Sequence, residues 1–458
     1  MQTEITSSHK KRFKRAIIMG ASVAGLWTAR ALSDYFEEVV LIERDKLPEG
    51  PEFRPGAPQV RQFHTLLLSG LQQMKIWFPG LDEELIAAGA VPYDPVNDVH
   101  LRIAGYWFPR FPSGQTLLSC SRVLLESAIR KRLRQIPGIH FIEGVEVSGL
   151  AAEADKRRVI GVKTKERRHG SRYGSADPVH QADLIVDALG RRSPMPEWLT
   201  ELGYPAPRES EVNSFLGYVS RKYKRKPNTP MMLIGGTPPV DPYGGLLFPE
   251  ENDTMVTLFT GYNKHYPPTD PDEFPAFAHN LGPEFEEALK DAEPISQPYG
   301  YRGTSSRWRH YEELNQWPER LIVLGDAFCG FNPVYGQGMS VAALSAAALA
   351  RHVHRADNLD GIAKPTLREI SHITQGVWLL ATSADLEWPG TEGGTISNNP
   401  MDRFARWYVH KLLEASAYDK QVRLQFLAVN QLMKPGTALF TPAIFLRVMK
   451  HTFFKKNM

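Results

Sequence analysis

Leu321-Ile-Val-Leu-Gly-Asp326, with Asn332-Pro333 and Gly336-Gln-Gly-Met-Ser340 close behind it, is the stretch that decides the fold of this chain. The apolar run predicts a short buried strand that carries Asp326 to its carboxyl end. Glycine-rich backbone follows, and the Ala-rich residues 341–350 predict a helix. Because the first amides of a helix have no partner within it, such a corner attracts anionic or electron-rich ligand atoms.

A second strand-turn-helix pattern lies near the amino terminus. Ala16-Ile-Ile-Met-Gly-Ala-Ser-Val-Ala-Gly25 has small residues at the first, third and sixth positions of the turn, and Glu43 ends the next strand. This order is typical of a mononucleotide-binding unit, in which helix amides hold a pyrophosphate and the acid accepts from ribose hydroxyls. Ser22 stands where the motif usually has its second Gly. Alone, the pattern also allows the alternative of a helix that is only packed closely on a strand.

Two further elements lie between these motifs. Ala182-Asp-Leu-Ile-Val-Asp187-Ala-Leu-Gly190 predicts a strand that ends in an acid, and Ser121-Arg122 opens a helical stretch that reaches Arg134. In this order the four elements resemble the FAD-dependent monooxygenases, the superfamily of aromatic hydroxylases and squalene epoxidase. The resemblance covers roughly residues 15–447 and implies that the chain binds FAD.

Within that superfamily the chain looks most like squalene epoxidase and the flavin epoxidases of bacterial polyether biosynthesis. The similar stretches are Arg54-Pro-Gly-Ala-Pro-Gln59, His64-Thr-Leu-Leu, Arg307-Trp-Arg-His-Tyr311 and the segment from Asn332 to Met339. Many relatives have a second His near position 62, where this chain has Gln62. A role for a His pair is therefore not predicted, and His64 is the single weak catalytic candidate.

The resemblance also implies which residues contact the cofactor. Asp326 is expected to hold the ribityl hydroxyls, and the amides that open the following helix are expected to stabilise negative charge on the reduced flavin ring. Glu43 favours an unphosphorylated adenosine ribose. The expected FAD contacts are Gly20, Ser22, Ala24, Gly25, Glu43, Arg44, Arg61, Arg122, Val147, Asp187, Gly190, Asp326, Pro333, Gly336, Gly338 and Met339.

The implied reaction is epoxidation or hydroxylation of a small lipophilic substrate, of polyketide or terpenoid type. Reduced flavin adds O2, and the resulting flavin hydroperoxide passes an oxygen atom to the substrate. An apolar roof that excludes water is expected from Phe215, Leu246, Phe248 and Phe259, although alternation along their strands equally predicts a plain core. No carboxylate pair, Ser-His-Asp set or metal-ligand cluster has convincing spacing, so neither a catalytic base nor a metal is predicted.

Two other functions share this fold. One is a flavin-dependent reductase of isoprenoid double bonds, which could use the segment from Tyr243 to Glu250; the other is a non-redox cyclase or isomerase that holds FAD. Flavin-dependent halogenases also share it, but Trp378 and Trp388 do not reproduce their Trp-x-Trp segment. The electron donor is left open between NAD(P)H, bound transiently near Arg191 and Arg192, and a separate flavin reductase.

The predicted fold class is α/β with mixed α+β content, and it has three parts. Each of three segments contains a strand that must join the same sheet, so together they should form one discontinuous, Rossmann-like FAD-binding domain. The segments between them should form an antiparallel-sheet substrate domain, roofing the flavin. The expected ranges are 14–90, 116–210 and 298–355 for the FAD domain, 91–115 and 211–297 for the substrate domain, 356–458 for a C-terminal helical region, 1–13 for a disordered basic tail, and 165–180 for an exposed hairpin loop.

Composition sets the remaining expectations. The 54 basic and 51 acidic residues are too balanced for a nucleic-acid surface, and the two cysteines suit a reducing cytoplasm. No segment approaches about 18 consecutive apolar residues. The basic amphipathic helix expected at 442–454 is interpreted as packing on the domain, with peripheral membrane contact as the alternative. The sequence predicts no oligomeric state.

Overall fold

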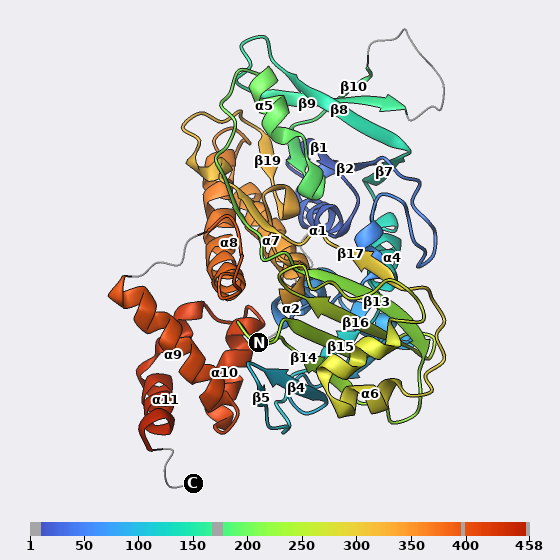
Figure 1. Ribbon diagram of the computed structural model, residues 1–458. Helices are drawn as coiled ribbons and strands as arrows, with labels where there is room; N and C mark the ends of the chain where they lie inside the picture. Colours follow the sequence, from blue (N-terminus) through green and yellow to red (C-terminus); the bar gives the residue numbers. More distant parts are fainter. Residues whose placement is uncertain (1–10, 167–176, 395–398, 455–458) are drawn as a thin grey trace, which may run out of the picture.

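The computed structural model describes residues 11–166, 177–394 and 399–454 (Figure 1). Most of the predicted basic tail and of the predicted hairpin loop at 165–180 therefore lies outside the described residues.

A five-stranded parallel sheet forms the centre of the upper lobe in Figure 1. Its strands run in the order β19-β11-β1-β2-β7, and each neighbouring pair is parallel. The carboxyl halves of β1 and β2 and the whole of β11 and β19 are buried and mainly apolar, because both faces of the sheet are covered. They are β1 (Phe13–Met19), β2 (Phe36–Glu43), β7 (Ile139–Glu143), β11 (Leu184–Asp187) and β19 (Leu321–Val323).

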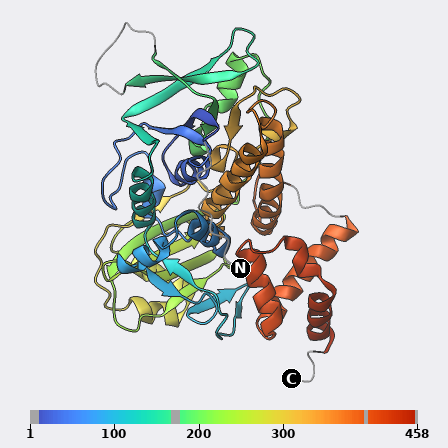
Figure 2. The same cartoon turned by 180° about the vertical axis from the view of Figure 1, so that it is seen from behind.

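Helices cover one face of this sheet and a small antiparallel sheet covers the other. Helix α1 packs on β1 and β2, and α4 and α7 pack against α1. On the opposite face, β8 contacts β2 and β9 contacts β11 (Figure 2). These elements are α1 (Val23–Leu32), α4 (Arg122–Arg134), α7 (Gly338–Arg355), β8 (Val145–Ala152), β9 (Val159–Glu166) and β10 (Val179–Gln181).

Two glycines make the turn between β1 and α1 possible. Gly20 has a φ of +100°, and a Cβ there would lie 2.7 Å from the carbonyl oxygen of Ala188. A Cβ on Gly25 would lie 1.9 Å from the carbonyl oxygen of Gly20. The chain therefore needs glycine at both positions to bring the helix start over the ends of the strands.

A seven-stranded sheet forms the second lobe, at the lower right of Figure 1. Its neighbouring strands are antiparallel, as expected, except that β14 and β4 pair in parallel. A long connection separates these two strands, and no tight turn sets their relative direction. In sheet order the strands are β17 (Tyr299–Tyr301), β13 (Gly217–Lys224), β16 (Thr254–Gly261), β15 (Tyr243–Glu250), β14 (Met231–Ile234), β4 (Val99–Ile103) and β5 (Tyr106–Trp107).

Shorter elements join the two lobes and cover their edges. On the outer face of the seven-stranded sheet, η3 (Pro275–Leu281) and α6 (Pro283–Leu289) close a small apolar core. The other connecting elements are η1 (Pro58–Arg61), α2 (Leu68–Trp77), α3 (Leu81–Ala87), β3 (Val91–Tyr93), β6 (Leu117–Ser119), η2 (Gly190–Arg192), α5 (Met195–Glu201), β12 (Glu209–Val212), β18 (Ser306–Arg309), η4 (Tyr311–Glu313), η5 (Gly325–Ala327), β20 (Cys329–Gly330) and η6 (Pro333–Tyr335).

The chain ends in helices that lie beside both lobes. Side-chain caps start two of them: Asn399 precedes Pro400 at the first position of α9, and Asp419 accepts hydrogen bonds from the amides of Gln421 and Val422 in α10. These elements are α8 (Ala363–Asp385), α9 (Pro400–Ser416), α10 (Lys420–Asn430), η7 (Gly436–Phe440) and α11 (Pro442–Phe454).

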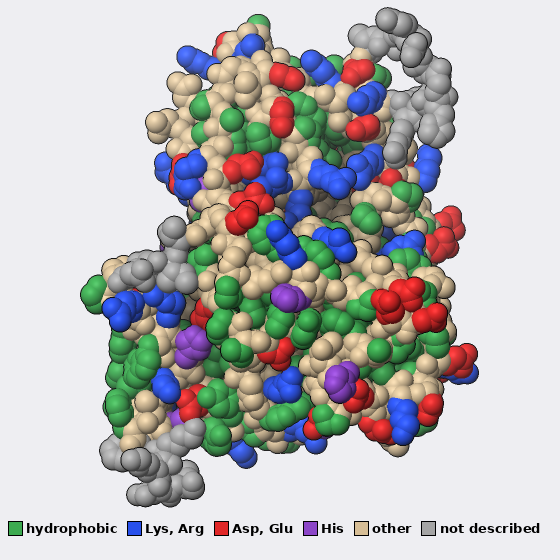
Figure 3. Space-filling view, in the orientation of Figure 1, with side chains coloured by type: hydrophobic (Ala, Val, Ile, Leu, Met, Phe, Trp, Pro, Cys, Tyr) green, Lys and Arg blue, Asp and Glu red, His purple; other side chains and the backbone are tan. Residues whose placement is uncertain are grey.

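The last helix buries one apolar face against its neighbours. Ile444 and Val448 of α11 pack in one cluster with Tyr408 and Leu412 of α9. Apolar side chains also gather on the outside of these helices, at the lower left of Figure 3. On α11 itself, Leu446 is exposed. Membrane contact by this region therefore stays a prediction. No helix within the described ranges is long and apolar enough to cross a membrane.

Candidate functional site

A cavity of about 1950 Å³ lies where the two lobes and the C-terminal helices meet. Its walls come from the loops after β1, β2 and β19, from the inner face of the seven-stranded sheet, and from α8, α9, α10 and η7. Cavities for one small ligand usually measure about 300–1,000 Å³. The volume therefore suffices for a nucleotide cofactor and a substrate together.

Most residues that the sequence predicts as cofactor contacts line one end of this cavity. They come from all four motif elements, although these elements lie far apart in the chain. The exceptions, which do not line the cavity, are Gly25, Arg61 and Asp187. The predicted residues that line the cavity are Gly20, Ser22, Ala24, Glu43, Arg44, Arg122, Val147, Gly190, Asp326, Pro333, Gly336, Gly338 and Met339.

Arg61 does not line the cavity, and its guanidinium packs on aromatic rings. Its guanidinium lies 4.6 Å from the ring centroid of Phe53 and 4.4 Å from that of Tyr299, an arrangement that cation–π attraction stabilises. Next to it, the amide of Gln62 donates to the carbonyl of Tyr299 at 2.9 Å and accepts from the hydroxyl of Ser220 at 2.5 Å. Residues 61 and 62 thus fasten η1 to the seven-stranded sheet.

Glu43 is buried at the end of β2 with several partners. Its carboxylate accepts from the amides of Ala21 and Asp45 at 3.0 and 3.1 Å. The guanidinium of Arg54 lies 3.1 Å from Glu43 and 3.2 Å from Asp45. Arg54 lines the cavity beside Glu43, and sequence reasoning assigned it no role. Its place in the Arg54-Pro-Gly-Ala-Pro-Gln59 stretch was the available signal.

Ser22 and Arg122 meet in a second hydrogen-bonded group at the start of α1. Arg122 donates to the hydroxyl of Ser22 at 2.9 Å and to the carboxylate of Glu126 at 2.8 Å. Ser22 also donates to Glu126 at 3.1 Å. The hydroxyl that replaces the usual glycine is thus engaged by α4, which leaves the amides of α1 facing the cavity end.

His64 touches this group through Arg122. Arg122 can only donate, so the Nε2 atom of His64, at 3.2 Å, is the acceptor, and its Nδ1–H then donates to the carbonyl of Gln62 at 2.9 Å. Burial, and next the positive charge of Arg122, lowers the pKa of His64 to about 3. The imidazole is therefore neutral at physiological pH, with both nitrogens in use. This geometry gives His64 a positioning role rather than that of a free base.

Asp187 supports the cavity from behind its wall. The carboxylate is fully buried, accepts from the amide of Leu189 at 2.9 Å, and also accepts from the hydroxyl of Ser193. Burial raises the pKa of Asp187 to about 6. These bonds shape the turn at Gly190, which has a φ of +78° and lines the cavity. Asp187 thus supports the turn at Gly190 and does not itself line the cavity.

Asp326 follows β19 and lines the cavity, and its side chain is 45% exposed. Its nearest cation is Arg191, at 3.6 Å. Arg191 itself donates to the carbonyls of Ser305 and Phe331, so it is held in place without Asp326. The carboxylate of Asp326 is therefore available to a ligand in the cavity.

The loop from Asn332 to Met339 curves around the same end. Gly336 has a φ of +68°, and a Cβ there would lie 2.9 Å from a methyl group of Thr65. The amide of Gln337 is buried and lines the cavity, yet neither its nitrogen nor its oxygen has a hydrogen-bond partner within the described residues. Buried polar groups of this kind usually bond to a ligand or to water.

A buried carboxylate that the sequence did not single out stands beside this loop. Asp385, at the end of α8, accepts from Asn332 at 2.9 Å, from Tyr335 at 3.0 Å and from Ser214 at 3.2 Å. Burial raises its pKa to about 6. Among the described residues it has hydrogen-bond donors but no cationic partner. Nothing in the sequence around Asp385 separates it from an ordinary helix-end acid.

Of the four residues predicted to form an apolar roof over the flavin, two lie on the inner face of the seven-stranded sheet and two do not. Leu246 and Phe248 line the cavity, as expected. Phe259 does not: it lies in the small core beneath η3 and α6, on the other face of the sheet. Side chains alternate between the faces of a strand, so Leu258, which pairs with Leu246, faces the cavity instead.

Phe215 is the other correction. It precedes β13 with a φ of +49°, and its ring lies 4.3 Å from the amino group of Lys264. Because the residue stands before the strand begins, strand alternation does not point it inward. It does not line the cavity.

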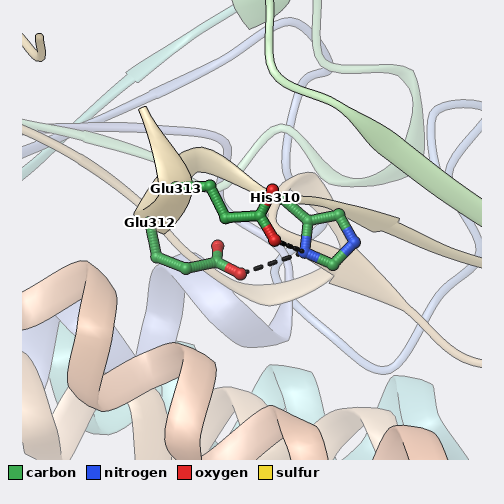
Figure 4. A group of neighbouring side chains, drawn as sticks. All are labelled: His310, Glu312 and Glu313. Carbon is green, nitrogen blue, oxygen red and sulfur yellow. Dashed lines mark hydrogen bonds and ion pairs between the residues drawn. The ribbon is translucent and has the colours of Figure 1, made fainter. Parts of the chain in front are cut away.

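His310, Glu312 and Glu313 come together outside the cavity (Figure 4). The Nδ1 atom of His310 lies 3.0 Å from Glu312 and 3.6 Å from Glu313, and its Nε2 atom lies 2.8 Å from the hydroxyl of Ser210. Arg208 makes two bonds to Glu313, at 2.7 and 3.0 Å. Hydrogen bonds and ion pairs account for the grouping, which fastens η4 to β12.

No family model matches the chain. Similar solved structures include a flavoprotein/dehydrogenase from Cytophaga hutchinsonii, with a TM-score of 0.67 and 14% identity over 96% of this chain and 99% of that one. The flavin-dependent brominase Bmp2 has a TM-score of 0.65 and 16% identity over 96% and 99% of the two chains. At these identities the likeness concerns the fold, and it confirms the predicted fold class.

A curated relative is closer in sequence. Protein Rv3254 of Mycobacterium tuberculosis is 33% identical to this chain over 386 residues, which are 81% of this chain and 80% of that protein. The chain belongs to the same protein family as Protein Rv3254.

Proposed function

We propose that this protein is an FAD-dependent monooxygenase that acts on a lipophilic substrate. The observation that carries the proposal is the cavity, which joins residues of all four FAD-type motifs to the apolar inner face of the seven-stranded sheet. A large cavity with a polar end and an apolar wall is the usual form of a cofactor and substrate site.

The residues at the polar end fit a flavin dinucleotide. The turn at Gly20 leaves backbone space that a Cβ would fill, and Ser22, Val23 and Ala24 at the start of α1 line the cavity beside it, where helix amides favour an anion. The oxygens of Glu43 each retain lone-pair capacity beyond the amides they accept from, so they can also accept from ribose hydroxyls. The buried amide of Gln337 has no hydrogen-bond partner among the described residues and suits the polar edge of a flavin ring.

When bound, reduced FAD would supply the activation of O2 and the transfer of one oxygen atom to substrate. The chain itself would hold and shield the reacting groups. Asp326 would accept from the ribityl hydroxyls, and the amides that open α7 would stabilise negative charge near Gly338. Leu246, Phe248 and Leu258 would exclude water from the substrate side.

Two possible bases that line the cavity, His64 and Tyr335, are already engaged within the protein, which favours a substrate that needs no deprotonation, such as an alkene. His64 is neutral, and both of its ring nitrogens make hydrogen bonds within the protein. The hydroxyl of Tyr335 donates to the carboxylate of Asp385. Oxygen transfer to an alkene needs no protein base, whereas hydroxylation of a phenol often uses one. We therefore place epoxidation of a polyketide-like or terpenoid alkene first, with hydroxylation second.

The test uses full-length protein, added FAD and isotopically labelled oxygen. Protein loaded with FAD is reduced with dithionite, mixed with a panel of terpenoid and polyketide alkenes, and exposed to 18O2. We expect one 18O atom in the product by mass spectrometry, and no product without oxygen. The same panel with oxidised FAD and no reductant is the control.

Each other result identifies a competing function or rejects the cofactor. Saturation of a double bond under anaerobic conditions would assign the reductase. Conversion with oxidised FAD and no electron donor would assign the cyclase or isomerase. Protein that retains no FAD after gel filtration, by absorbance near 450 nm, would reject flavin chemistry as a whole.

A further inference from the structure

One face of α10 forms the end of the cavity that lies away from the FAD-type motifs. Arg423, Phe426, Leu427 and Asn430 line the cavity and follow the spacing of a single helical face. Three of these four positions place apolar or neutral side chains there. Arg423 places a guanidinium.

Arg423 is 3% exposed, and its guanidinium stacks on one aromatic ring. Its carbon centre lies 4.8 Å from the ring centroid of Phe108. Within the described residues its side chain makes no hydrogen bond and no ion pair, and its Nε atom is buried without a partner. Burial lowers the pKa of Arg423 to about 10, so the group keeps its charge at physiological pH.

The other buried arginines show how this chain normally treats such a charge. Arg54 lies between two carboxylates, and Arg309 pairs with Glu209 and the carbonyl of Ser193. Arg130 and Arg221 donate to backbone carbonyls. A buried charge without a partner destabilises a fold, because its lost hydration is not replaced by other polar contacts. An arginine left in that state at a cavity wall requires a ligand-based explanation.

We propose that Arg423 binds an anionic group, in the first place a carboxylate, at one end of an otherwise apolar substrate. Stacking on Phe108 fixes the guanidinium plane and leaves its edge of N–H donors for a two-pronged bond to a planar anion. Apolar contacts for the body of the substrate come from Phe426, Leu427 and Leu439.

This inference deepens the proposed function and rests on it in one respect, the position of the reacting end. With the anion held at Arg423, the opposite end of the molecule would extend through the cavity towards Gly336 and Met339. The substrate class is then an amphiphile: a lipophilic acid oxidised at a site remote from its carboxylate.

The test compares matched single-chain probes on full-length protein. Decanoate, dodecanoate and tetradecanoate are titrated by calorimetry, with decanol and decyltrimethylammonium as the neutral and cationic counterparts. We expect at least one carboxylate to bind at least tenfold more tightly than decanol. Arg423→Met should weaken carboxylate binding at least tenfold and leave decanol binding unchanged, and Arg423→Lys should lie between the two.

A cationic residue on the same helix provides the matched control. Lys420 stacks on Phe111 but is exposed and does not line the cavity, so Lys420→Met should bind carboxylates as the unmodified protein does. Urea unfolding separates binding from folding. Since Arg423 is unpaired, Arg423→Met should unfold at the same or a higher urea concentration, whereas removing an arginine that the fold needs would lower the midpoint.

Three results would overturn the inference: no saturable carboxylate binding, equal binding by Arg423→Met, or a loss that tracks a lower unfolding midpoint. Flavin content is read in the same samples. Carboxylate binding through Arg423 in protein that never retains FAD would reject the proposed function alone. Retained FAD without binding that depends on Arg423 would reject this inference alone.

Discussion

At the motif end of the cavity, the buried guanidinium of Arg54 lies within 3.2 Å of two carboxylates. At the α10 end, the buried guanidinium of Arg423 contacts an aromatic ring and has no counter-ion in the part of the chain that the structure describes. The first arrangement is complete without a ligand. The second arrangement needs a ligand to give the guanidinium a partner. The fold can therefore form its motif end by its own pairing, while the α10 end leaves a stabilising contact to be made.

Asp385 stands between these extremes. It is a buried acid with three kinds of neutral donor around it and a raised pKa. The difference along the cavity teaches where to look for specificity. At the motif end, groups that are already paired would position the cofactor, which the motifs predict. At the α10 end, the unpaired group would select the substrate, which the motifs do not predict.

The largest expected effect comes from breaking the paired end. Glu43→Ala leaves Arg54 with Asp45 as its only carboxylate and leaves the amide of Ala21 without its acceptor. We expect a loss of about 3–5 kcal/mol in the free energy of unfolding, the usual effect of removing one member of a buried ion pair. Urea unfolding of the flavin-free protein measures it.

A control for this variant lies on the same strand. Glu38 pairs with Arg15 at 2.6 Å, but both side chains are more than 40% exposed. Exposed ion pairs contribute about 0–1 kcal/mol, so Glu38→Ala should be nearly neutral. Equal stability of the Glu43 and Glu38 variants would show that the motif end is not held by its buried charges.

Asp385 should give the next effect, through pH. Its pKa in the folded protein, about 6, exceeds the ordinary 3.8, so the folded state holds the proton more tightly. The resulting stability is fully present below about pH 4 and is lost as the pH rises through 6. A shift of about two units corresponds to roughly 2–3 kcal/mol.

Asp385→Asn removes that titration while keeping the shape of the side chain. The difference in unfolding free energy, original protein minus variant, should fall between pH 4 and 6 and level off near pH 7. Urea unfolding at one-unit intervals measures it. The depressed pKa of His64 acts in both proteins and cancels from the difference. Parallel pH profiles would mean that Asp385 is already ionised throughout.

The motif end was predictable because backbone geometry there dictates residue type. Gly20 and Gly25 are required by close approach, and Glu43 and Asp326 follow from where parallel strands end. Each signal is local in sequence, and strand order brings the four together. The fold class was predicted on the same grounds.

The rest depended on contacts that local patterns do not encode. Phe259 was predicted to face the cavity, but one residue of strand register turns it to the outer core. Asp385 and Arg423 stand on helices whose pattern shows only which positions are apolar. Both are buried without an oppositely charged partner among the described residues. This follows from how distant segments pack together, which local sequence patterns do not show.

The smallest expected effect compares two acids that the sequence treated alike. Asp326, unlike Glu43, is half exposed and its neighbour Arg191 keeps two backbone acceptors, so Asp326→Ala should change the stability of the flavin-free protein by about 0.5 kcal/mol or less. It should still weaken FAD binding by about 1–3 kcal/mol, the range for a lost hydrogen-bond partner. Flavin fluorescence titration measures this, and Glu287→Ala, an exposed acid on α6, controls for net charge. A lower FAD affinity with unchanged stability of the flavin-free protein would show that Asp326 binds the cofactor. An equal loss of both would show that Asp326 stabilises the fold, as Glu43 does.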